Sequence, residues 1–582
     1  MSIFSQPEWN NFVRVSRGHP WLWPHYGVQI FVLVMRRLLN ALRIRLAGSN
    51  HRGLKRRPAW LPPIQSGAAG DACAKLAFPA FASPAAPQQL EQPRFAAGDP
   101  EGYFFSQRWS NCHAAALGDE NAAAAALDAV LTWIDSAPPK TDAAWETYSA
   151  CERVVNLAVM LSVHAGCRSR VEQKCAAEIG GFFDASARWI DSRLEYYGMA
   201  RTNNHCLNNA RALVVAGSVL GDATRVAQGL LLFTRMAREL FQPAGFLRER
   251  SSHYQIVVTN WVFDTLHFAR AVTPGNEVAR AALAELETLS GRVAAATARL
   301  VDAFDGIDTQ IGDISPDNHP TAAVARLRRL YPSIFSTTDA VDDWQLDDWI
   351  CISSRSQRLV ACGMPSQHPF DYTTHGHPDL GGFVWKYKAN AILVDAGRMT
   401  YHQDATSSAQ SAASGHNVLL VNTLPALAGS LLSGGRWCPT PYARAAVQLR
   451  HRPREGFDIE HDGFRRIAGI GLHKRSVRIE DNGISIRDQL DGSGWVDIEL
   501  LWHFAPGLTP AGKTDQHPLH GNGLQVLAQT SGTDNATSAY WESYSYSPCY
   551  GGSQRASRLR VRRRVCLPWS GETTLRVTPC AA

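Results

Sequence analysis

The sequence predicts a multidomain protein in which an all-helical domain is followed by a domain of antiparallel β-strands. Its 582 residues exceed the size at which one hydrophobic core stops growing. Residues 112–335 carry apolar residues at helical spacing, and after Asp343 the pattern changes to short alternating runs. Runs of helices followed by runs of strands are typical of separate α and β domains and not of a βαβ fold.

The chain begins with a basic arm. Residues 1–60 contain ten Lys or Arg and the single acid Glu8, so this segment carries a charge of +9 and the remainder −3. Such an arm can bind an anionic membrane surface, nucleic acid or an acidic polymer. The chain has no nucleic-acid-binding motif, so we expect no nucleic-acid partner, and contact between the arm and a membrane surface stays open.

An apolar stretch lies within this arm, from Val28 to Met35. It is shorter than the roughly 20 residues of a spanning helix. No basic region precedes it, and Arg36 and Arg37 follow it, so it is not typical of an export signal. We expect a first helix packed on the body, with an amphipathic surface helix as the alternative.

Eight prolines between residues 58 and 100 predict an irregular connection after the arm. We therefore divide the chain into an arm and connection (1–95), a helical domain (96–340) and a β domain (341–582). Apolar residues at helical spacing are illustrated by Leu207, Ala210, Val214 and Gly217. Alternation around an Asn482-Gly483 turn predicts a hairpin and is carried by Val477, Ile479, Ile484 and Ile486.

The composition is that of a globular protein, with 45% hydrophobic and 19% charged residues. Twelve cysteines show no CxxC pair or framework spacing, so we expect buried thiols and no disulfide scaffold. P-loop, GxGxxG, HExxH and GxSxG motifs are absent from the sequence, and we expect no organic cofactor.

Asn203, Asn204 and His205 lie at the predicted start of a helix within residues 202–217. Asn204 can serve simply as the N-cap of this helix, with His205 in its first turn. Alternatively, the corner projects an amide and an imidazole into a cleft, where they suit hydrogen bonding to a substrate carboxylate. The residues alone leave both interpretations open.

Tyr254 follows a dense group of polar residues, in the segment 246–255, before another apolar helix. It can be an aromatic residue of the helix core. Its phenol could also transfer a proton if nearby cations lowered its usual pKa of about 10.

His375, His377 and Asp379 open the predicted β domain in close order, and Asp395 and His416 follow downstream. If the segment is extended, His375 and His377 lie on one face. Two histidines and one aspartate are a ligand set that suits Zn²⁺. The spacing does not decide the matter, because the ligands would come from different strands.

Taken in order, these segments resemble the heparinase II/III-like polysaccharide lyases. Residues 144–161 contain a Trp-Glu-x-Tyr run leading to Arg-x-x-Asn, and residues 186–198 precede the Asn-His corner as in that family. Residues 503–507 and 545–552 resemble its late sheet motifs. The resemblance implies an (α/α) toroid followed by an antiparallel β-sandwich domain.

The resemblance also implies the chemistry: β-elimination on a uronic-acid-containing acidic polysaccharide, giving unsaturated products. Asn204 and His205 would neutralise the uronate carboxylate, and Tyr254 and His375 would act as base and acid. His377, Asp395 and His416 match the structural zinc site of the family. Family members work in the bacterial periplasm, so a cell-envelope location is implied, with the cytoplasm as the alternative.

Three positions depart from the family pattern, and two other function classes stay open. Gln255 replaces a His, and Asn208 and Asn209 replace an acidic residue, which puts the substrate in doubt. A glycoside hydrolase on the same toroid would need two carboxylates, for which Glu249 and Asp313 are the best candidates. A non-catalytic polysaccharide-binding or assembly protein is the third class, and the sequence leaves the oligomeric state open.

Overall fold

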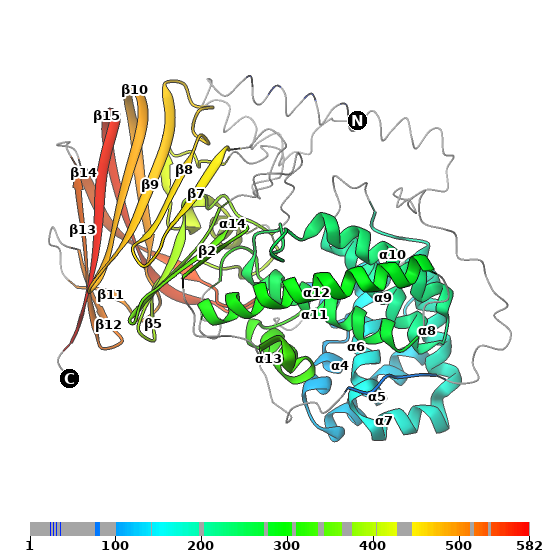
Figure 1. Cartoon of the computed structure of the whole chain (residues 1–582). Coiled ribbons are helices and arrows are strands. Elements are labelled where there is room, and N and C mark those ends of the chain that lie inside the picture. Colours follow the sequence, from blue (N-terminus) through cyan, green and yellow to red (C-terminus); the bar gives the residue numbers. More distant parts are fainter. Residues whose placement is uncertain are drawn as a thin grey trace, which may run out of the picture.

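The structure is a computed structural model in which a helical domain lies beside a β-sheet domain (Figure 1). It describes residues 76–81, 100–140, 142–196, 203–272, 277–304, 310–335, 343–363, 375–402, 404–427, 445–511, 517–532 and 537–580, with single positions at 24, 27, 31 and 35. Most of the basic arm and of the predicted connection lies outside the described residues. The membrane contact and the location of the protein therefore stay predictions.

The helical domain is built of α-helices joined by short turns. They are α3 (Pro100–Ser106), α4 (Ser110–Leu117), α5 (Glu120–Asp135), α6 (Thr147–Val163), α7 (Ala165–Arg170), α8 (Ala176–Asp191), α9 (Asn204–Val219), α10 (Ala223–Leu240), α11 (Ser252–Arg270), α12 (Glu277–Ala303) and α13 (Pro320–Leu330). Among the helices that the structure describes, none is both long and apolar enough to cross a membrane.

Three of these helices, α6, α9 and α11, are buried along almost their whole length. Polar residues on a helix that is buried all round must find partners inside the protein. By contrast, α10 and α12 expose polar residues on one face. Asn204, His205 and Tyr254 of the candidate site come from these inner helices, where their positions are constrained by packing.

The β domain contains two antiparallel sheets. The first has the strand order β1 (Trp344–Leu346), β2 (Trp349–Ser353), β3 (Gln357–Cys362), β4 (Phe383–Tyr387) and β5 (Asn390–Leu393). The second has the order β11 (Thr509–Pro510), β12 (Pro518–Gly521), β13 (Leu524–Gly532), β15 (Gln554–Pro579), β10 (Gly483–His503), β9 (Ile470–Glu480), β8 (Gly456–His461) and β7 (Val447–Arg452). In addition, β14 (Thr537–Tyr546) pairs with β15, and β6 (Leu419–Val421) pairs with β10.

The predicted hairpin is confirmed, because β9 and β10 pair antiparallel with Glu480 opposite Gly483. The two sheets share one apolar core, in which Phe383 of the first sheet contacts Phe457 and Trp502 of the second. On the outer strand face, Arg560 and Arg562 pair with Glu499. The predicted order of an all-helical domain and an antiparallel β domain is thus confirmed.

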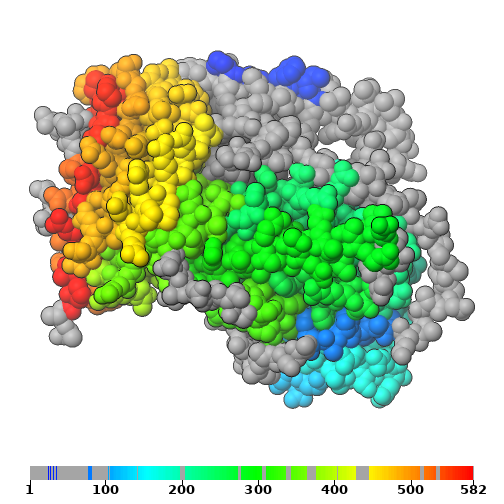
Figure 2. Space-filling view, in the orientation of Figure 1, coloured from blue at the N-terminus to red at the C-terminus, as the bar shows by residue number. Residues whose placement is uncertain are grey.

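The two domains are packed against each other. The ring of Phe246 stacks on Trp344 and on Trp349, with a centroid distance of 5.7 Å in both cases. The side chain of Asp347 accepts hydrogen bonds from two backbone N–H groups of the loop after α10. In the space-filling view, the atoms of the first sheet lie directly against those of the helical domain (Figure 2).

Candidate active site

Helix α9 begins at the Asn-His corner, but its N-cap is Asn203, whose side chain accepts from the N–H of His205 at 3.2 Å. The assignment of Asn204 as the cap is therefore wrong by one residue. Asn204 is 1% exposed, and its amide nitrogen donates to Glu249 Oε2 at 3.0 Å and to His375 Nε2 at 3.0 Å. Its Oδ1 atom is buried without a hydrogen-bond partner.

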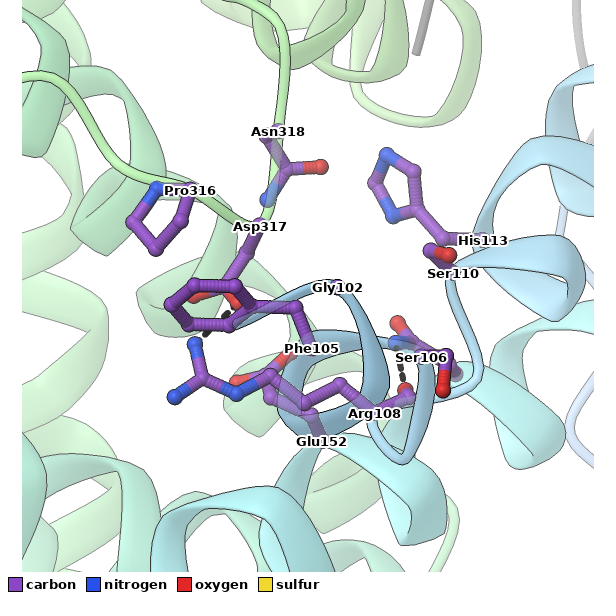
Figure 3. A pocket seen from close by; sticks show the side chains of 11 residues that line it. Gly102, Phe105, Ser106, Arg108, Ser110, His113, Glu152, Pro316, Asp317 and Asn318 are labelled. Atoms are coloured by element: carbon purple, nitrogen blue, oxygen red, sulfur yellow. Dashed lines mark hydrogen bonds and ion pairs between the residues drawn. The ribbon is translucent and has the colours of Figure 1, made fainter. Parts of the chain in front are cut away.

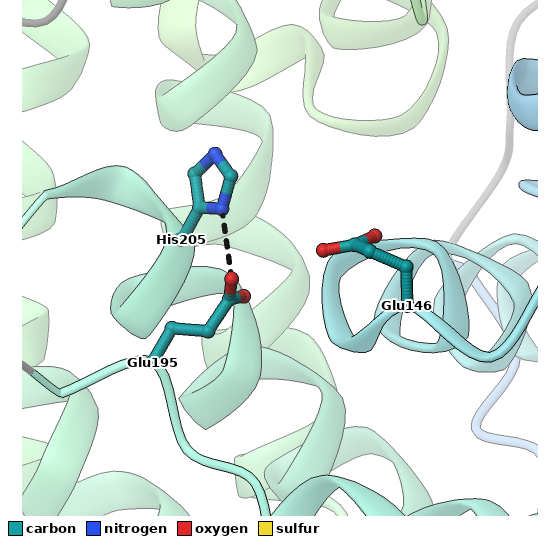
Figure 4. Close-up of side chains that lie close together, drawn as sticks. All are labelled: Glu146, Glu195 and His205. Atoms are coloured by element: carbon teal, nitrogen blue, oxygen red, sulfur yellow. Dashed lines mark hydrogen bonds and ion pairs between the residues drawn. The ribbon is translucent and has the colours of Figure 1, made fainter. Parts of the chain in front are cut away.

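His205 lies beside two carboxylates. Its Nδ1 is 3.2 Å from Glu195 Oε1, and its ring lies on that of Tyr148 with a centroid distance of 4.7 Å. Figure 4 shows the carboxylate of Glu146 facing the His205–Glu195 pair. Burial lowers the pKa of His205, but the Glu195 carboxylate outweighs it, so the pKa is raised above its usual value. The side chain is 40% exposed and can therefore be reached by a ligand.

Tyr254 lies in the first turn of α11, where the Ser251 side chain accepts from its backbone N–H. Its ring stacks on the His375 imidazole, with centroids 3.5 Å apart and planes 10° apart. Its hydroxyl is 2.9 Å from that of Tyr401, which in turn donates to the carbonyl of Ile314. The Tyr254 hydroxyl therefore donates to Tyr401.

The electrostatic environment of Tyr254 differs from the sequence-based expectation. Burial, followed by the nearby Asp317 carboxylate, raises the pKa of Tyr254 above its usual value. The condition stated from the sequence, a pKa lowered by nearby cations, is therefore not met. The phenol stays protonated at neutral pH, which suits the role of a proton donor.

Asp313 holds His375 from the other side. His375 Nδ1 is 3.3 Å from Asp313 Oδ2, and its Nε2 accepts from Asn204. Because an ionised carboxylate only accepts hydrogen bonds, Nδ1 carries the proton and Nε2 keeps the lone pair. The imidazole is therefore held in the tautomer of a general base.

Asp313 also contacts His377, with an Oδ1–Nε2 distance of 2.7 Å, and Arg398 at 3.7 Å. Burial raises the pKa of Asp313, but Arg398 and the two histidines outweigh it and hold the pKa well below its usual value. The preceding Gly312 has φ +80°, and a Cβ there would lie 2.5 Å from the carbonyl oxygen of Arg250. Only glycine fits this approach, which brings Asp313 to the histidines.

Two of the three predicted metal ligands, Asp395 and His416, lie in one group of possible ligand atoms, whose third member is Asp379 and not His377. Asp395 Oδ1 is 3.2 Å from His416 Nδ1, and Asp379 joins them in a group whose ligand atoms all lie within 4.8 Å of one another. The His377 ring lies 5.0 Å from that of His416. His377 Nδ1 and His416 Nε2 are buried without hydrogen-bond partners, so these donor atoms fit a borderline metal ion.

Sequence reasoning missed some of the contacts that complete this arrangement. Tyr401 and Glu195 were assigned no role, and no spacing pattern marks them, while Asp379 was noted only for its place beside His375 and His377. Glu249 and Asp313 were considered only as hydrolase carboxylates, whereas the structure places them as partners of Asn204 and of the two histidines.

The three departures from the family pattern lie inside the helical domain. Gln255 Oε1 accepts from the N–H of Leu247 at 2.6 Å, and its Nε2 donates to the carbonyl of Gly245 at 3.1 Å. Asn208 donates to Glu152, and Asn209 donates to Glu195, the partner of His205. Gln255 and Asn208 thus support the domain, while Asn209 orients a residue at the site.

Comparison with known proteins assigns the C-terminal region. Residues 353–576 match the model of the family described as heparinase II/III-like, C-terminal. No curated protein sequence matches the chain.

Among solved structures, the chain is similar to a heparinase III at 13% identity, covering 82% of this chain and 76% of that one, with a TM-score of 0.58. A second heparinase III has 14% identity, covers 84% and 80%, and has a TM-score of 0.58. The heparan sulfate lyase HepC from Pedobacter heparinus has 14% identity, covers 85% and 79%, and has a TM-score of 0.52. The chain thus has the heparinase III fold, a helical toroid followed by antiparallel sheets.

Proposed function

We propose that the protein is a polysaccharide lyase that cleaves a uronic-acid-containing acidic polysaccharide by β-elimination. One observation carries the proposal: the phenol of Tyr254 stacks on His375, and the Nε2 of that imidazole lies 3.0 Å from the amide of Asn204. A proton donor, a base in a defined tautomer and a hydrogen-bond donor thus converge where the two domains meet. The heparinase III fold supports the same reaction class.

The reaction needs these groups for a physical reason. Removing the C5 proton of a uronate is difficult while its carboxylate is charged, so donors must stabilise the enolate-like transition state. His205 is suited to this task because Glu195 raises its pKa and its ring is partly exposed. Asn204 can contribute the N–H that it now gives to His375, because a protonated His375 can no longer accept it.

We assign the two proton transfers from the electrostatics. His375 Nε2 takes the C5 proton, the C5–H electron pair forms the new double bond, and the C4–O bond breaks. Tyr254 gives its hydroxyl proton to the leaving oxygen, because its raised pKa keeps it protonated. Each transfer contributes roughly 10²- to 10⁴-fold in rate.

We further propose that Asp395, His416 and His377 hold one Zn²⁺, with Asp379 beside them. Bound there, the metal would supply structural cohesion and no chemistry of the elimination. The residues it joins would hold the segment that carries His375 against the strands beside it. The unpartnered nitrogens of His377 and His416 support this proposal.

The hydrolase alternative is less well supported. Both of its candidate carboxylates are buried, Glu249 at 2% and Asp313 at 3% exposure. Glu249 accepts two hydrogen bonds from Asn204, and Asp313 is bonded to His375 and His377. A hydrolase needs a protonated acid and a carboxylate that meet the sugar, and neither residue offers a free oxygen to it.

The test is the near-ultraviolet absorbance of an unsaturated uronate, followed with a panel of acidic polysaccharides. Tyr254→Phe should reduce turnover about 10²- to 10⁴-fold, because the proton donor is lost. Tyr331→Phe is the matched control, since its buried hydroxyl donates to Asp264 within the helical domain. Unchanged product formation by Tyr254→Phe would refute the assignment, and new reducing ends without absorbance would favour the hydrolase.

A further inference from the structure

The second sheet exposes one large aromatic side chain on the face turned away from the apolar core. Trp495 of β10 is 62% exposed, and among the tryptophans that the structure describes it alone is exposed. Its chain neighbour Val496 is 7% exposed and belongs to the core shared by the two sheets. Because successive side chains of a strand alternate between its faces, Trp495 lies on the outer face. Its indole offers a ligand a large apolar surface there.

A bulge in β10 directly precedes Trp495. The register of β10 with β15 shifts between Leu490 and Gly494, and Gly494 has φ +88°. This left-handed conformation is one that glycine adopts readily. A β-bulge bends its strand and is common beside functional sites, where it re-aims a side chain. The position of the bulge therefore supports a binding role for the indole that follows it.

An arginine without an ion-pair partner lies beside this indole. Cys566 of β15 is directly opposite Trp495, and Arg564 is two positions from Cys566 on the same face. Such a diagonal neighbour lies about 7–8 Å away, within reach of a long side chain. Arg564 is exposed, and in the part of the chain that the structure describes it forms no ion pair, whereas Arg560 and Arg562 pair with carboxylates.

The guanidinium of Arg564 can therefore bind a carboxylate from solution. Arg108 in the helical domain illustrates the opposite case, because it forms an ion pair with Asp317 inside the protein (Figure 3). A guanidinium is planar and can donate two parallel hydrogen bonds to one carboxylate. An aromatic platform and an available guanidinium thus lie next to each other on the outer face.

A second aromatic residue and cation lie farther along the same face. The guanidinium carbon of Arg562 is 5.7 Å from the ring centroid of Tyr540 in β14. Arg562 is 51% exposed, and its Nε is 3.2 Å from Glu499, which leaves its two terminal nitrogens available to a ligand. Tyr540 is opposite Arg560 and Trp495 is opposite Cys566, so the two rings are roughly 20 Å apart along the strand direction. A ligand that contacts both rings must be a chain of several sugars.

The charges of this face favour a ligand of low charge density. Four arginines of β15 share it with three carboxylates of β10 and β14, and they are Arg558, Arg560, Arg562 and Arg564 with Asp497, Glu499 and Glu542. Four positive charges minus three negative charges give a balance of +1. A nucleic acid carries a charge on every residue and would be repelled by the carboxylates. A polymer of sugars with single carboxylates offers both apolar ring faces and separated charges.

We propose that this outer face is a second, non-catalytic binding site for an acidic polysaccharide of the uronate type. One sugar ring stacks on the indole of Trp495 while its carboxylate binds Arg564, and a later sugar of the same chain reaches Tyr540 and Arg562. The identity of the polymer rests on the proposed lyase function, whereas the mode of recognition rests on these four side chains.

The site is separate from the candidate active site. In Figure 1, β10, β14 and β15 lie on the side of the β domain away from the helical domain, which carries Asn204 and Tyr254. A polymer held on this face therefore leaves the candidate active site open to the same chain or to another one. Attachment at two sites raises the effective concentration of the polymer at the enzyme.

The test is affinity electrophoresis in native gels that contain alginate, polygalacturonate or heparosan, which are uronate polymers without sulfate. The parent protein is the full chain with His205→Ala and Tyr254→Phe, so that the candidate active site neither holds nor cleaves the polymer. Trp495→Ala in this background should weaken binding about three- to tenfold, because the stacking surface is lost. Arg564→Gln should weaken binding about five- to tenfold, because a charge-assisted hydrogen bond is lost.

Arg576→Gln is the matched control. Arg576 is an exposed arginine of the same strand, and it lies roughly 40 Å from Arg564 along β15. The substitution removes the same charge and should leave binding unchanged. All these proteins carry the basic arm, so a difference between them does not come from that segment.

Equal binding of Trp495→Ala and the parent protein to all three polymers would overturn the proposal. Equal losses in Arg564→Gln and Arg576→Gln would also overturn it, because binding would then follow net charge alone. Sedimentation equilibrium tests a second copy of this chain as the occupant, and a dimer that Trp495→Ala dissociates would equally refute the polysaccharide site. The proposed function would fail by a different result, the absence of unsaturated product from the unsubstituted enzyme, which leaves the comparison of binding intact.

Discussion

Replacing Asp313 by Asn tests the idea that this carboxylate fixes the tautomer of the catalytic base. Asp313 accepts from His375 Nδ1 at 3.3 Å and from His377 Nε2 at 2.7 Å. An amide can donate as well as accept, so it can stabilise the opposite tautomer, in which His375 Nε2 carries the proton. In that state the imidazole has no lone pair for the C5 proton of the substrate.

The expected loss is about 10³- to 10⁴-fold in kcat, the size seen when a carboxylate that orients a catalytic histidine becomes an amide. This corresponds to roughly 4–5.5 kcal/mol in the activation barrier. KM should change little, because Asn204 and His205 are left in place. Stability should also fall, by about 3–5 kcal/mol, because Arg398 loses a buried partner.

Asp488→Asn is a matched control, because Asp488 has the same kind of partners and bonds to none of the proposed catalytic residues. Its carboxylate accepts from His473 Nε2 at 2.8 Å and from Arg475 Nε at 2.8 Å, and all three side chains are buried. This variant should lose stability and keep kcat. Comparing the two variants separates a defect in folding from a defect in the base.

The control also has a predictable pH dependence. Burial raises the pKa of Asp488, but Arg475 and His473 together outweigh it and lower the pKa to about 2. A carboxyl group whose pKa is lower in the folded state than in the unfolded state stabilises the fold. This stabilisation is fully present above the unfolded-state pKa of about 3.9 and is lost as the pH falls through the folded-state pKa. The difference in unfolding free energy between Asp488→Asn and the unsubstituted protein should therefore shrink by about 2–3 kcal/mol between pH 5 and pH 2.

The assay is the rate of near-ultraviolet absorbance with a polysaccharide that the unsubstituted enzyme cleaves, at a temperature where both variants are folded by circular dichroism. Urea unfolding gives the stabilities. The reasoning about the tautomer would be refuted by an Asp313→Asn variant that kept kcat within about threefold. It would equally be refuted if folded Asp488→Asn lost as much activity as Asp313→Asn.

Two further predictions concern the metal and the interior of the helical domain. The purified protein should contain about one zinc ion per chain by mass spectrometry, as expected for a structural zinc site, and a chelator should lower its Tm. His416→Ala should lose the zinc, whereas the control His473→Ala should keep it. Equal zinc content in the two variants would contradict the assignment of the ligands. Gln255→Ala should lower the free energy of unfolding by about 2–4 kcal/mol in urea, because it leaves the N–H of Leu247 and the carbonyl of Gly245 without their side-chain partner. Its kcat should be unchanged, and a change in substrate preference would contradict a purely structural role.

The order of domains and the position of the Asn-His corner could be predicted, because both depend on local patterns. The helical spacing of apolar residues, the alternation of apolar and polar residues in a strand and a two-residue turn can each be recognised within a few neighbouring residues. The partners of the site residues could not be predicted, because they come from distant segments of the chain. Glu249 and Asn204 are separated by 45 positions in the sequence, and Asp313 and His375 by 62. Only the packing of the inner helices against the β domain determines such pairs.

The direction of the pKa shift of Tyr254 could not be predicted from the sequence either. Arg248 and Arg250 precede Tyr254 in the sequence and could lower its pKa if they lay beside it, but Arg250 pairs with Asp379. Burial and the Asp317 carboxylate then raise the pKa of Tyr254 instead. The sequence left the sign of this pKa shift open, because the direction of one long side chain helps to decide it.

The division of the site between domains limits what the matched family region can do alone. Residues 353–576 contain His375, but Asn204 and Tyr254 lie in α9 and α11. One contact that aligns them is the approach at Gly312, where the Asp313 loop lies against the backbone of His375, with an Asp313 N–H to His375 carbonyl distance of 2.8 Å. Since the proposed base, its orienting carboxylate and the proposed proton donor come from three separate segments, the proposed reaction would require both domains in their packed arrangement.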